Sequence, residues 1–248
     1  MFAVFKKELR SYFINAIGYV YVAAFLCASA VICGLTTWHA KSYSTASYFS
    51  ALIYAFIILI PLLTMKLFAE EKKLKTEQLL MTAPISIPQM VLGKFFASLT
   101  LFVGTVLISC INFFPLYSLA TRERSQAEYA VEHIGPVTAE IVSCALGLVL
   151  LGAAFIAIGL FVSSLTENQL AAAVVTVCII FGMIMLDVVN AYIDTYAIRA
   201  ALSFACVLSR FNNFTYGILD FSSILYYLSI TAVFLFLTTR VYDKRRWG

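Results

Sequence analysis

Six long apolar runs recur along the chain, with most of the charged residues between them. They lie at about residues 16–36, 47–68, 91–119, 137–163, 168–189 and 222–241. Each run is long enough to cross a hydrocarbon core of about 30 Å as an α-helix. The pattern therefore predicts an all-α membrane protein with six transmembrane helices, in which residues 1–248 form a single transmembrane domain.

The segment before the first run, residues 2–14, has a different pattern. Apolar side chains recur there at helical spacing: Phe2, Phe5, Leu9 and Phe13. Charged side chains occupy the other side: Lys6, Lys7, Glu8 and Arg10. This pattern is typical of a helix that lies in the membrane interface. A cleaved signal peptide is the less favoured alternative, because the apolar run from Ala16 to about Leu35 is too long for one.

Lysine and arginine residues predict how the chain is oriented. If the N-terminus is cytoplasmic, twelve of them flank the cytoplasmic ends of the runs, and five lie outside. Cytoplasmic loops of membrane proteins carry the excess of such residues. We therefore expect both termini on the cytoplasmic side of the inner or plasma membrane of a prokaryote.

Composition agrees with a membrane protein and excludes an ordinary soluble one. Hydrophobic residues make up 62% of the chain and charged residues 12%, and the mean hydropathy is +0.93. Soluble domains have roughly 45–50% apolar and about 25% charged residues. Six crossings use nearly the whole length, which leaves no room for a separate catalytic domain. The six cysteines lie in or beside apolar runs without a Cys-x-x-Cys pair, so we interpret them as packing residues.

The sequence has no motif for catalysis or nucleotide binding. It lacks a Walker phosphate-binding loop, a His-Glu-x-x-His pair and a Gly-x-Ser-x-Gly turn. We expect no catalytic, cofactor-binding or metal-binding residue, and no nucleic-acid partner. The acidic loop 122–140 is interpreted as solvated, because Glu132 and His133 lack ligand spacing. The middles of the runs carry no ionisable residue, which argues against proton or sodium coupling.

The most informative segment is the charged stretch 69–84 between the second and third runs. Glu70 and Glu71 stand at its start and Pro84 at its end, as expected of a helix over 70–83. Ser86 and Gln89 then have the spacing of a capping box that begins the next span. From periodicity alone, such a helix simply solvates the cytoplasmic face.

Its residue order suggests a more specific role. The relevant strings are Phe68-Ala69-Glu70-Glu71-Lys72-Lys73, Thr76-Glu77, Leu79-Leu80, Ala83-Pro84-Ile85 and Leu92-Gly93-Lys94-Phe95. This order resembles the first cytoplasmic loop of ABC-2-type exporter permeases, most closely the gliding-motility branch. Two further stretches, Ser163 to Gln169 and Phe211 to Trp247, are also similar. The resemblance therefore covers most of the chain.

The resemblance implies that residues 70–83 form a coupling helix, which docks into a separate cytoplasmic ATPase subunit. The implied interface comprises Glu70, Glu71, Lys72, Lys73, Leu74, Glu77, Leu79, Leu80 and Met81, with Glu167 and Asn168 as a weaker contact. Two ATPase subunits, which hold ATP and Mg, and a second permease copy or a related permease are the implied partners. The chain itself is then not an enzyme.

Residues 190–220 are too polar to span a membrane and too apolar for a free loop. Irregular backbone at membrane depth is tolerated only where protein or a water-filled cavity covers it. We therefore expect a re-entrant hairpin between spans five and six. The resemblance implies an external gate there, with Asn212, Asn213, Phe214 and Asp220 as its residues.

The function that follows is ATP-driven export of a substrate across the cytoplasmic membrane. The alternative is a mechanotransmission or anchoring complex of the same architecture that transports nothing.

Overall fold

The structure is a computed structural model, and it describes residues 1–39, 45–76, 86–118, 120, 136–193, 199, 202–203 and 206–247. These residues form helices joined by short connections, and no strand occurs among them. Six helices are long and apolar enough to cross a membrane: Ala16–His39, Ala46–Lys73, Ile87–Ser118, Thr138–Leu165, Gln169–Ala191 and Phe221–Arg246. The prediction of an all-α protein with six candidate membrane spans is confirmed.

The individual helices have the following bounds. They are α1 Phe2–Ile14, α2 Ala16–Cys33, the π-helix η1 Gly34–His39, α3 Ala46–Thr64, α4 Ala69–Lys73, α6 Ile87–Ser109, the 3-10 helix η2 Cys110–Phe113, α8 Thr138–Leu165, α9 Gln169–Ala191, α11 Leu208–Thr215 and α12 Phe221–Trp247.

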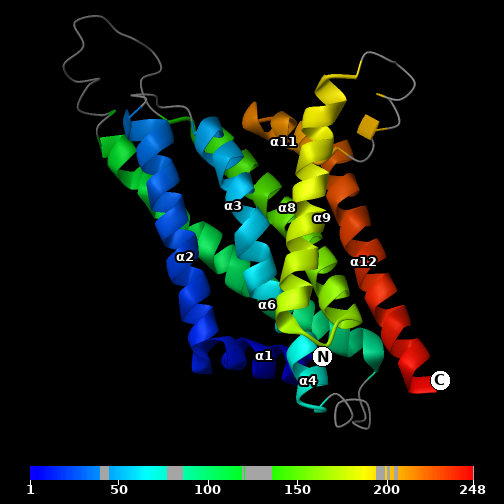
Figure 1. Cartoon of the computed structure of the whole chain (residues 1–248). Helices are drawn as coiled ribbons and strands as arrows, with labels where there is room; N and C mark the ends of the chain where they lie inside the picture. Colours follow the sequence, from blue (N-terminus) through cyan, green and yellow to red (C-terminus); the bar gives the residue numbers. More distant parts are fainter. Residues whose placement is uncertain are drawn as a thin grey trace, which may run out of the picture.

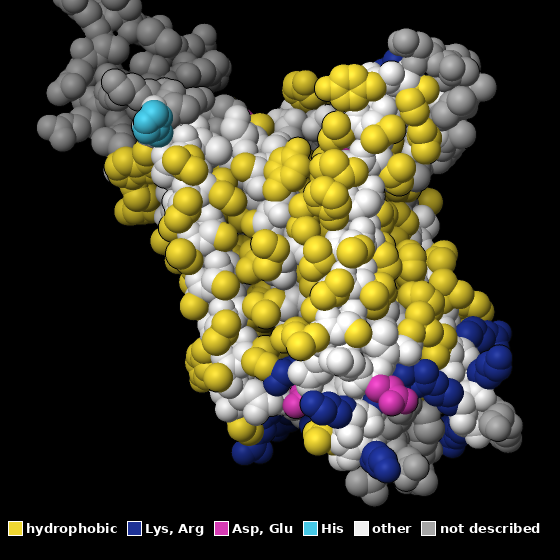
Figure 2. Space-filling view, viewed as in Figure 1, with side chains coloured by type: hydrophobic (Ala, Val, Ile, Leu, Met, Phe, Trp, Pro, Cys, Tyr) yellow, Lys and Arg dark blue, Asp and Glu magenta, His cyan; other side chains and the backbone are white. Residues whose placement is uncertain are grey.

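The long helices run side by side, and the short ones lie at their two ends (Figure 1). Helix α1 runs across one end of the bundle, where α4 and both termini also lie. Helix α11 lies at the opposite end. We call these the α4 end and the α11 end. Figure 2 shows hydrophobic side chains over the middle of this face, with most of the charged side chains gathered at the α4 end.

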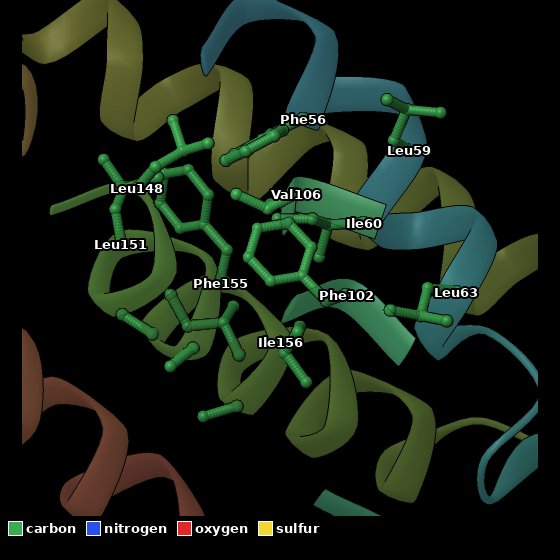
Figure 3. Close-up of a cluster of buried hydrophobic side chains, with 14 of the residues drawn as sticks. Phe56, Leu59, Ile60, Leu63, Phe102, Val106, Leu148, Leu151, Phe155 and Ile156 are labelled. Carbon is green, nitrogen blue, oxygen red and sulfur yellow. The ribbon is translucent and has the colours of Figure 1, made fainter. Parts of the chain in front are cut away.

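Helix α8 is the centre of the bundle, since it packs against α3, α6, α9, α11 and α12. About two thirds of its most apolar stretch (67%) is buried, against 22% for α9 and for α12. Phe56 of α3, Phe102 of α6 and Phe155 of α8 meet in the core (Figure 3). The rings of Phe56 and Phe102 contact edge to face, with centroids 5.2 Å apart. Such pairs add about 0.5–1.5 kcal/mol beyond their burial.

Two glycines let neighbouring helices approach α8 closely. A Cβ atom at Gly152 would lie 2.3 Å from the Phe102 ring, and one at Gly159 would lie 2.3 Å from the hydroxyl oxygen of Thr64. Small residues at helix contacts are typical of membrane bundles, where packing rather than water exclusion drives association.

Gly152→Val and Gly159→Val are therefore expected to destabilise the protein by about 1–3 kcal/mol each, because the core there has no space for extra atoms. Gly182→Val is the matched control, since a Cβ atom at Gly182 would meet nothing within 4 Å. Thermal unfolding of the detergent-purified variants measures the effect. Equal unfolding midpoints for Gly152→Val and Gly182→Val would show that the α6–α8 contact is looser than the structure has it.

Helix α1 is fixed to the bundle by one face. Val4, Glu8 and Tyr12, spaced four residues apart, are its buried residues. The Tyr12 hydroxyl donates a hydrogen bond to the Leu63 carbonyl over 3.1 Å. Burial, and next the nearby Glu8 carboxylate, raise the pKa of Tyr12 well above its usual value. Glu8 therefore belongs to the packed face, although its charge grouped it with the solvated residues of this helix.

The capping box predicted before the third span places the helix start correctly, but its capping hydrogen bond to the Ser86 side chain is absent. Helix α6 does begin at Ile87 with Ser86 in the N-cap position and Pro88 in its first turn. The Ser86 side chain, however, makes no capping hydrogen bond. Extended backbone at Ser86 and the fixed φ of Pro88 thus define this helix start.

Candidate functional site

Helix α4 is fastened to the end of α8 by backbone and side-chain hydrogen bonds. The backbone amides of Phe68 and Ala69 both donate to the Ser163 hydroxyl oxygen over 3.1 Å. That hydroxyl in turn donates to the Met65 carbonyl over 3.3 Å. The Lys72 amine donates to the Ser164 carbonyl. The start of the loop and the C-terminal end of α8 therefore form one unit.

A buried lysine joins α4 to two further helices. Lys94, near the start of α6, is only 1% exposed. Its amine lies 3.0 Å from a Glu8 carboxylate oxygen of α1 and 2.9 Å from a Glu71 carboxylate oxygen of α4. It also donates to the Leu67 carbonyl over 2.6 Å. Hydrogen bonds to Glu8 and Leu67 thus use two of the three N–H donors of the ammonium group, and Glu71 forms an ion pair with it.

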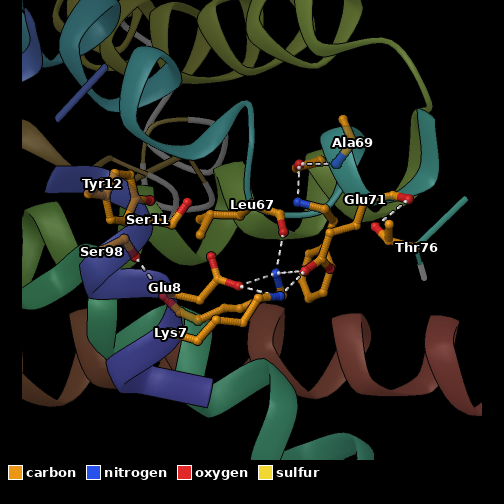
Figure 4. Close-up of polar contacts among 12 residues, drawn as sticks. Lys7, Glu8, Ser11, Tyr12, Leu67, Ala69, Glu71, Thr76 and Ser98 are labelled. Carbon is orange, nitrogen blue, oxygen red and sulfur yellow. Dashed lines mark hydrogen bonds and ion pairs between the residues drawn. The ribbon is translucent and has the colours of Figure 1, made fainter. Parts of the chain in front are cut away.

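The two glutamates come from segments far apart in the sequence. Figure 4 shows Glu8 and Glu71 pointing toward one another from α1 and α4. Their side chains are 11% and 15% exposed. The Phe68 ring adds a cation–π contact, with its centroid 5.0 Å from the Lys94 amine.

A second lysine balances the charge. The Lys7 amine lies 3.1 Å from Glu71 and 3.6 Å from Glu8, and its side chain is 57% exposed. Partial burial lowers the pKa of Lys7, but Glu71 and Glu8 outweigh that effect, so the net pKa is raised. Two positive and two negative charges thus share one site, which we call the lysine–glutamate cluster: Lys7, Glu8, Glu71 and Lys94.

The cluster links α1, α4 and α6 by ion pairs. Buried charges are costly unless they are paired and hydrogen-bonded. Separating these helices would therefore leave buried charges without a partner, which costs free energy. The end of α12 joins the same region, because the rings of Phe68 and Tyr242 contact in a tilted arrangement with centroids 4.7 Å apart. The α4 segment is therefore connected to α6, α8 and α12 at this end of the bundle.

The expected continuous helix over 70–83 is wrong where the structure describes it. Helix α4 ends at Lys73, and Lys75 has a left-handed backbone with a φ of 57°. The Thr76 amide donates to the Glu71 carbonyl and the Lys75 amide to the Lys72 carbonyl. These two bonds form a Schellman motif, which terminates a helix. The motif leaves Lys73, Leu74 and Lys75 exposed at the tip of the described loop, with Leu74 63% exposed.

The predicted interface residues therefore differ in their surroundings. Glu71 points inward to the cluster, and Glu70 lies 3.7 Å from Lys66 on the surface. Lys73 and Leu74 face outward. Glu77, Leu79, Leu80 and Met81 lie outside the described residues.

The short connection between α8 and α9 lies beside α4. Glu167 and Asn168 are both exposed there. The Asn168 side-chain oxygen accepts from the Leu170 amide over 3.0 Å and caps α9. These residues thus extend the exposed surface of the α4 end.

At the α11 end, one carboxylate that the sequence pattern did not single out holds the start of α11. Asp187 of α9 accepts hydrogen bonds from the backbone amides of Val207, Leu208 and Ser209, at 2.9, 2.9 and 3.0 Å. Negative charge at a helix N-terminus satisfies amides that have no partner within the helix. Asp187 therefore fixes the start of α11 to the fifth span.

Of the four predicted gate residues, Asn212, Asn213 and Phe214 lie on α11, and Asp220 directly precedes α12. Asn213 donates to the Asp220 carboxylate over 3.0 Å, and Ser223 does so over 2.8 Å. The hydrogen bond from Ser223, followed by that from the Ser222 amide, lowers the pKa of Asp220. Phe214 is fully buried, whereas Asn212 is exposed. Asp220 thus ties α11 to the start of α12.

Asp187→Ala is expected to loosen α11 by about 1–2 kcal/mol, since three backbone amides lose their acceptor. Hydrogen–deuterium exchange of residues 207–211 should then be faster, while that of α4 is unchanged. Asp243→Ala removes one carboxylate at the α4 end and serves as the control. Slow exchange of α11 in Asp187→Ala would show that packing alone holds this helix.

Neither end of the bundle offers an obvious metal site in the part of the chain that the structure describes. No group of three His, Cys, Asp or Glu side chains is suitably arranged there.

Comparison with known proteins identifies the bundle. A family model described as ABC-2 family transporter protein matches residues 34–193, which is more than half of the chain. The match includes α4, Glu71, Lys94 and four of the six candidate spans in full. No curated protein matches the chain.

Proposed function

This chain belongs to the ABC-2 family of transporter proteins, and we propose that it is the membrane-spanning permease subunit of an ATP-binding-cassette exporter. Permeases of this kind work with separate ABC ATPase subunits and are not themselves catalytic. We place the chain in the gliding-motility branch, on the loop strings quoted above.

The observation that carries the proposal is the lysine–glutamate cluster. A permease that is driven by a separate ATPase subunit needs a cytoplasmic segment that is exposed at its tip, where the subunit binds, and fixed to the helices at its base. Leu74 is exposed, whereas Glu71, three residues earlier, is held by Lys94 and Lys7. The described part of this segment, Glu70 to Thr76, is thus fixed at its base and exposed at its far end, which supports a role as a lever.

The mechanism begins with ATP-driven closure of two ATPase subunits, each holding ATP and Mg. Closure displaces two copies of this loop, one from each permease of a dimer. The cluster passes the displacement to α1 and α6, and Ser163 passes it to α8. Rigid-body movement of packed helices then carries it across the bilayer.

The charge distribution supports a cytoplasmic α4 end. Helix α1, α4 and both termini share that end (Figure 1), and in the sequence twelve basic residues fall to this side against five on the other. The positive-inside rule then places the α11 end outside a prokaryotic cytoplasmic membrane. There, α11 and the neighbouring residues of the 190–220 hairpin act as the external gate.

Purification of the tagged chain from its native membranes tests the proposal. We expect a subunit with Walker motifs to co-purify in about equal amount and to hydrolyse ATP. Proteoliposomes of that complex should then move a substrate in an ATP-dependent way. A chain that purifies without any Walker-motif subunit contradicts the permease proposal. A complex that hydrolyses ATP but moves nothing indicates mechanotransmission instead.

A further inference from the structure

Helix α1 has a basic face that its packing against the bundle does not use. Its exposed cations Lys6 and Arg10 lie on the opposite side from the buried Val4, Glu8 and Tyr12. The third exposed cation, Lys7, lies on the flank and also contacts the cluster. Within the described residues, no carboxylate lies in ion-pair distance of Lys6 or Arg10. Two positive charges on this face therefore lack an acidic partner in that part of the chain.

This face carries a surface hollow of about 580 Å³, lined by Ala3, Lys6, Lys7, Arg10, Ser11 and Ile14. The lining contributes three cations, one hydroxyl and two apolar side chains, and no carboxylate. An anion with several acceptor oxygens and an attached apolar group complements such a lining, because Arg and Lys are strong donors to phosphate.

The neighbouring side chains indicate where that anion comes from. Phe2, Phe13 and Ile14 of α1 are 76%, 48% and 69% exposed. Helix α1 also runs across the end of a bundle whose long helices are candidate membrane spans (Figure 1). A helix with exposed aromatic side chains beside exposed cations lies at the boundary between lipid headgroups and acyl chains.

We propose that the hollow binds one anionic phospholipid of the surrounding membrane. Lys6 and Arg10 hold its phosphate, Ser11 donates a further hydrogen bond, and Ala3 and Ile14 contact the upper part of an acyl chain. Lys7 borders the hollow and also contacts Glu71. The Lys7 side chain thus lies between the bound lipid and Glu71 of α4.

The proposal requires only that the chain resides in a membrane, and it stands or falls independently of the ATPase partner. Native mass spectrometry of the detergent-purified chain tests it by titration with phosphatidylglycerol and with phosphatidylcholine of the same acyl chains. The variant is Lys6→Gln/Arg10→Gln. The control is Lys244→Gln/Arg246→Gln, which removes the same charge from the end of α12.

We expect the unaltered chain and the α12 control to bind phosphatidylglycerol at least about tenfold more tightly than phosphatidylcholine. The α1 variant should lose about tenfold or more in its affinity for phosphatidylglycerol alone, since each basic residue near an anionic lipid surface contributes measurably. If the double variant is not recovered folded, Arg10→Gln alone should weaken binding by at least about threefold.

Equal binding of the two lipids by the unaltered chain overturns the proposal. So does an α1 variant, double or single, that keeps the full preference for phosphatidylglycerol. Unchanged lipid binding together with a lost ATPase subunit would assign this face to a protein partner and would equally overturn it.

Discussion

Lys94→Met is expected to reduce the free energy of unfolding by about 3 kcal/mol and to uncouple ATP hydrolysis from the movement of the spans. The methionine side chain fills a similar volume but donates no hydrogen bond. Glu8 and Glu71 then remain close together and mostly buried, with only the exposed Lys7 to balance them. Removing one partner of a buried ion pair typically costs about 3–5 kcal/mol, and the partial exposure of the glutamates favours the lower value.

Thermal unfolding in detergent measures the stability effect, and Lys66→Met is the matched control. Lys66 lies 3.7 Å from Glu70, and both side chains are partly exposed, at 22% and 34%. Such surface pairs contribute about 0–1 kcal/mol. If Lys94→Met and Lys66→Met unfold alike, Lys94 does not hold the α4 end together. Lys94→Arg, which keeps the charge, should lie between Lys94→Met and the unaltered chain.

Leu74→Asp is expected to weaken recruitment of the ATPase subunit strongly while leaving the permease folded. Leu74 is 63% exposed at the tip of the described loop, just after α4 ends. An apolar anchor at the centre of an interface commonly contributes 2 kcal/mol or more. Its replacement by a carboxylate should therefore weaken the complex by about thirtyfold or more, measured by co-purification or by titration of the isolated subunit.

Leu219→Asp provides the control at the other end of the bundle. Leu219 is 57% exposed and lies between α11 and α12. The substitution is the same, and the exposure of the two leucines is similar. Full recruitment by Leu74→Asp would assign the contact to another part of the chain, such as Glu167 and Asn168.

Charge reversal at Glu71 is a less informative test of the same contact. Glu71→Lys would place a third cation beside Lys94 and Lys7, because all three side chains meet in the cluster. A loss of ATPase binding could then arise from a displaced α4 rather than from a lost contact. Substitutions at the exposed Lys73 or Leu74 avoid this ambiguity.

The six candidate spans could be predicted from the sequence because each is a local property of a run of apolar residues. The partner of Lys94 could not be predicted from the sequence. Glu8 lies 86 residues away from it, and hydrophobic periodicity contains no information about such a pair. The available signal was local and small: Lys94 stands one turn inside an otherwise apolar span, where an unpaired charge is costly.

The sequence did not predict where α4 ends, for a different reason. Helices commonly end with glycine in the left-handed position, but here Lys75 occupies it. Lysine is a good helix former, so propensity favoured continuation through this point. The hydrogen bonds from Lys75 and Thr76 back to Lys72 and Glu71 prevail instead.

Asp187 illustrates a third limit. Its position near the end of an apolar run was visible in the sequence, but its role depends on α11, which begins about 20 residues later. The polar residues of the segment 190–220 indicated that it is unusual. Only the fold shows that a carboxylate from the fifth span caps its helix.

The central claim is that the loop following α4 contacts an ABC ATPase subunit. Site-specific photo-crosslinking in native membranes tests it most directly, with a photoreactive amino acid in place of Leu74 and, separately, in place of Leu219. Position 74 is expected to crosslink to a protein with Walker motifs, identified by mass spectrometry, and position 219 is not. The claim is contradicted if neither position crosslinks to a Walker-motif protein, or if position 219 alone does.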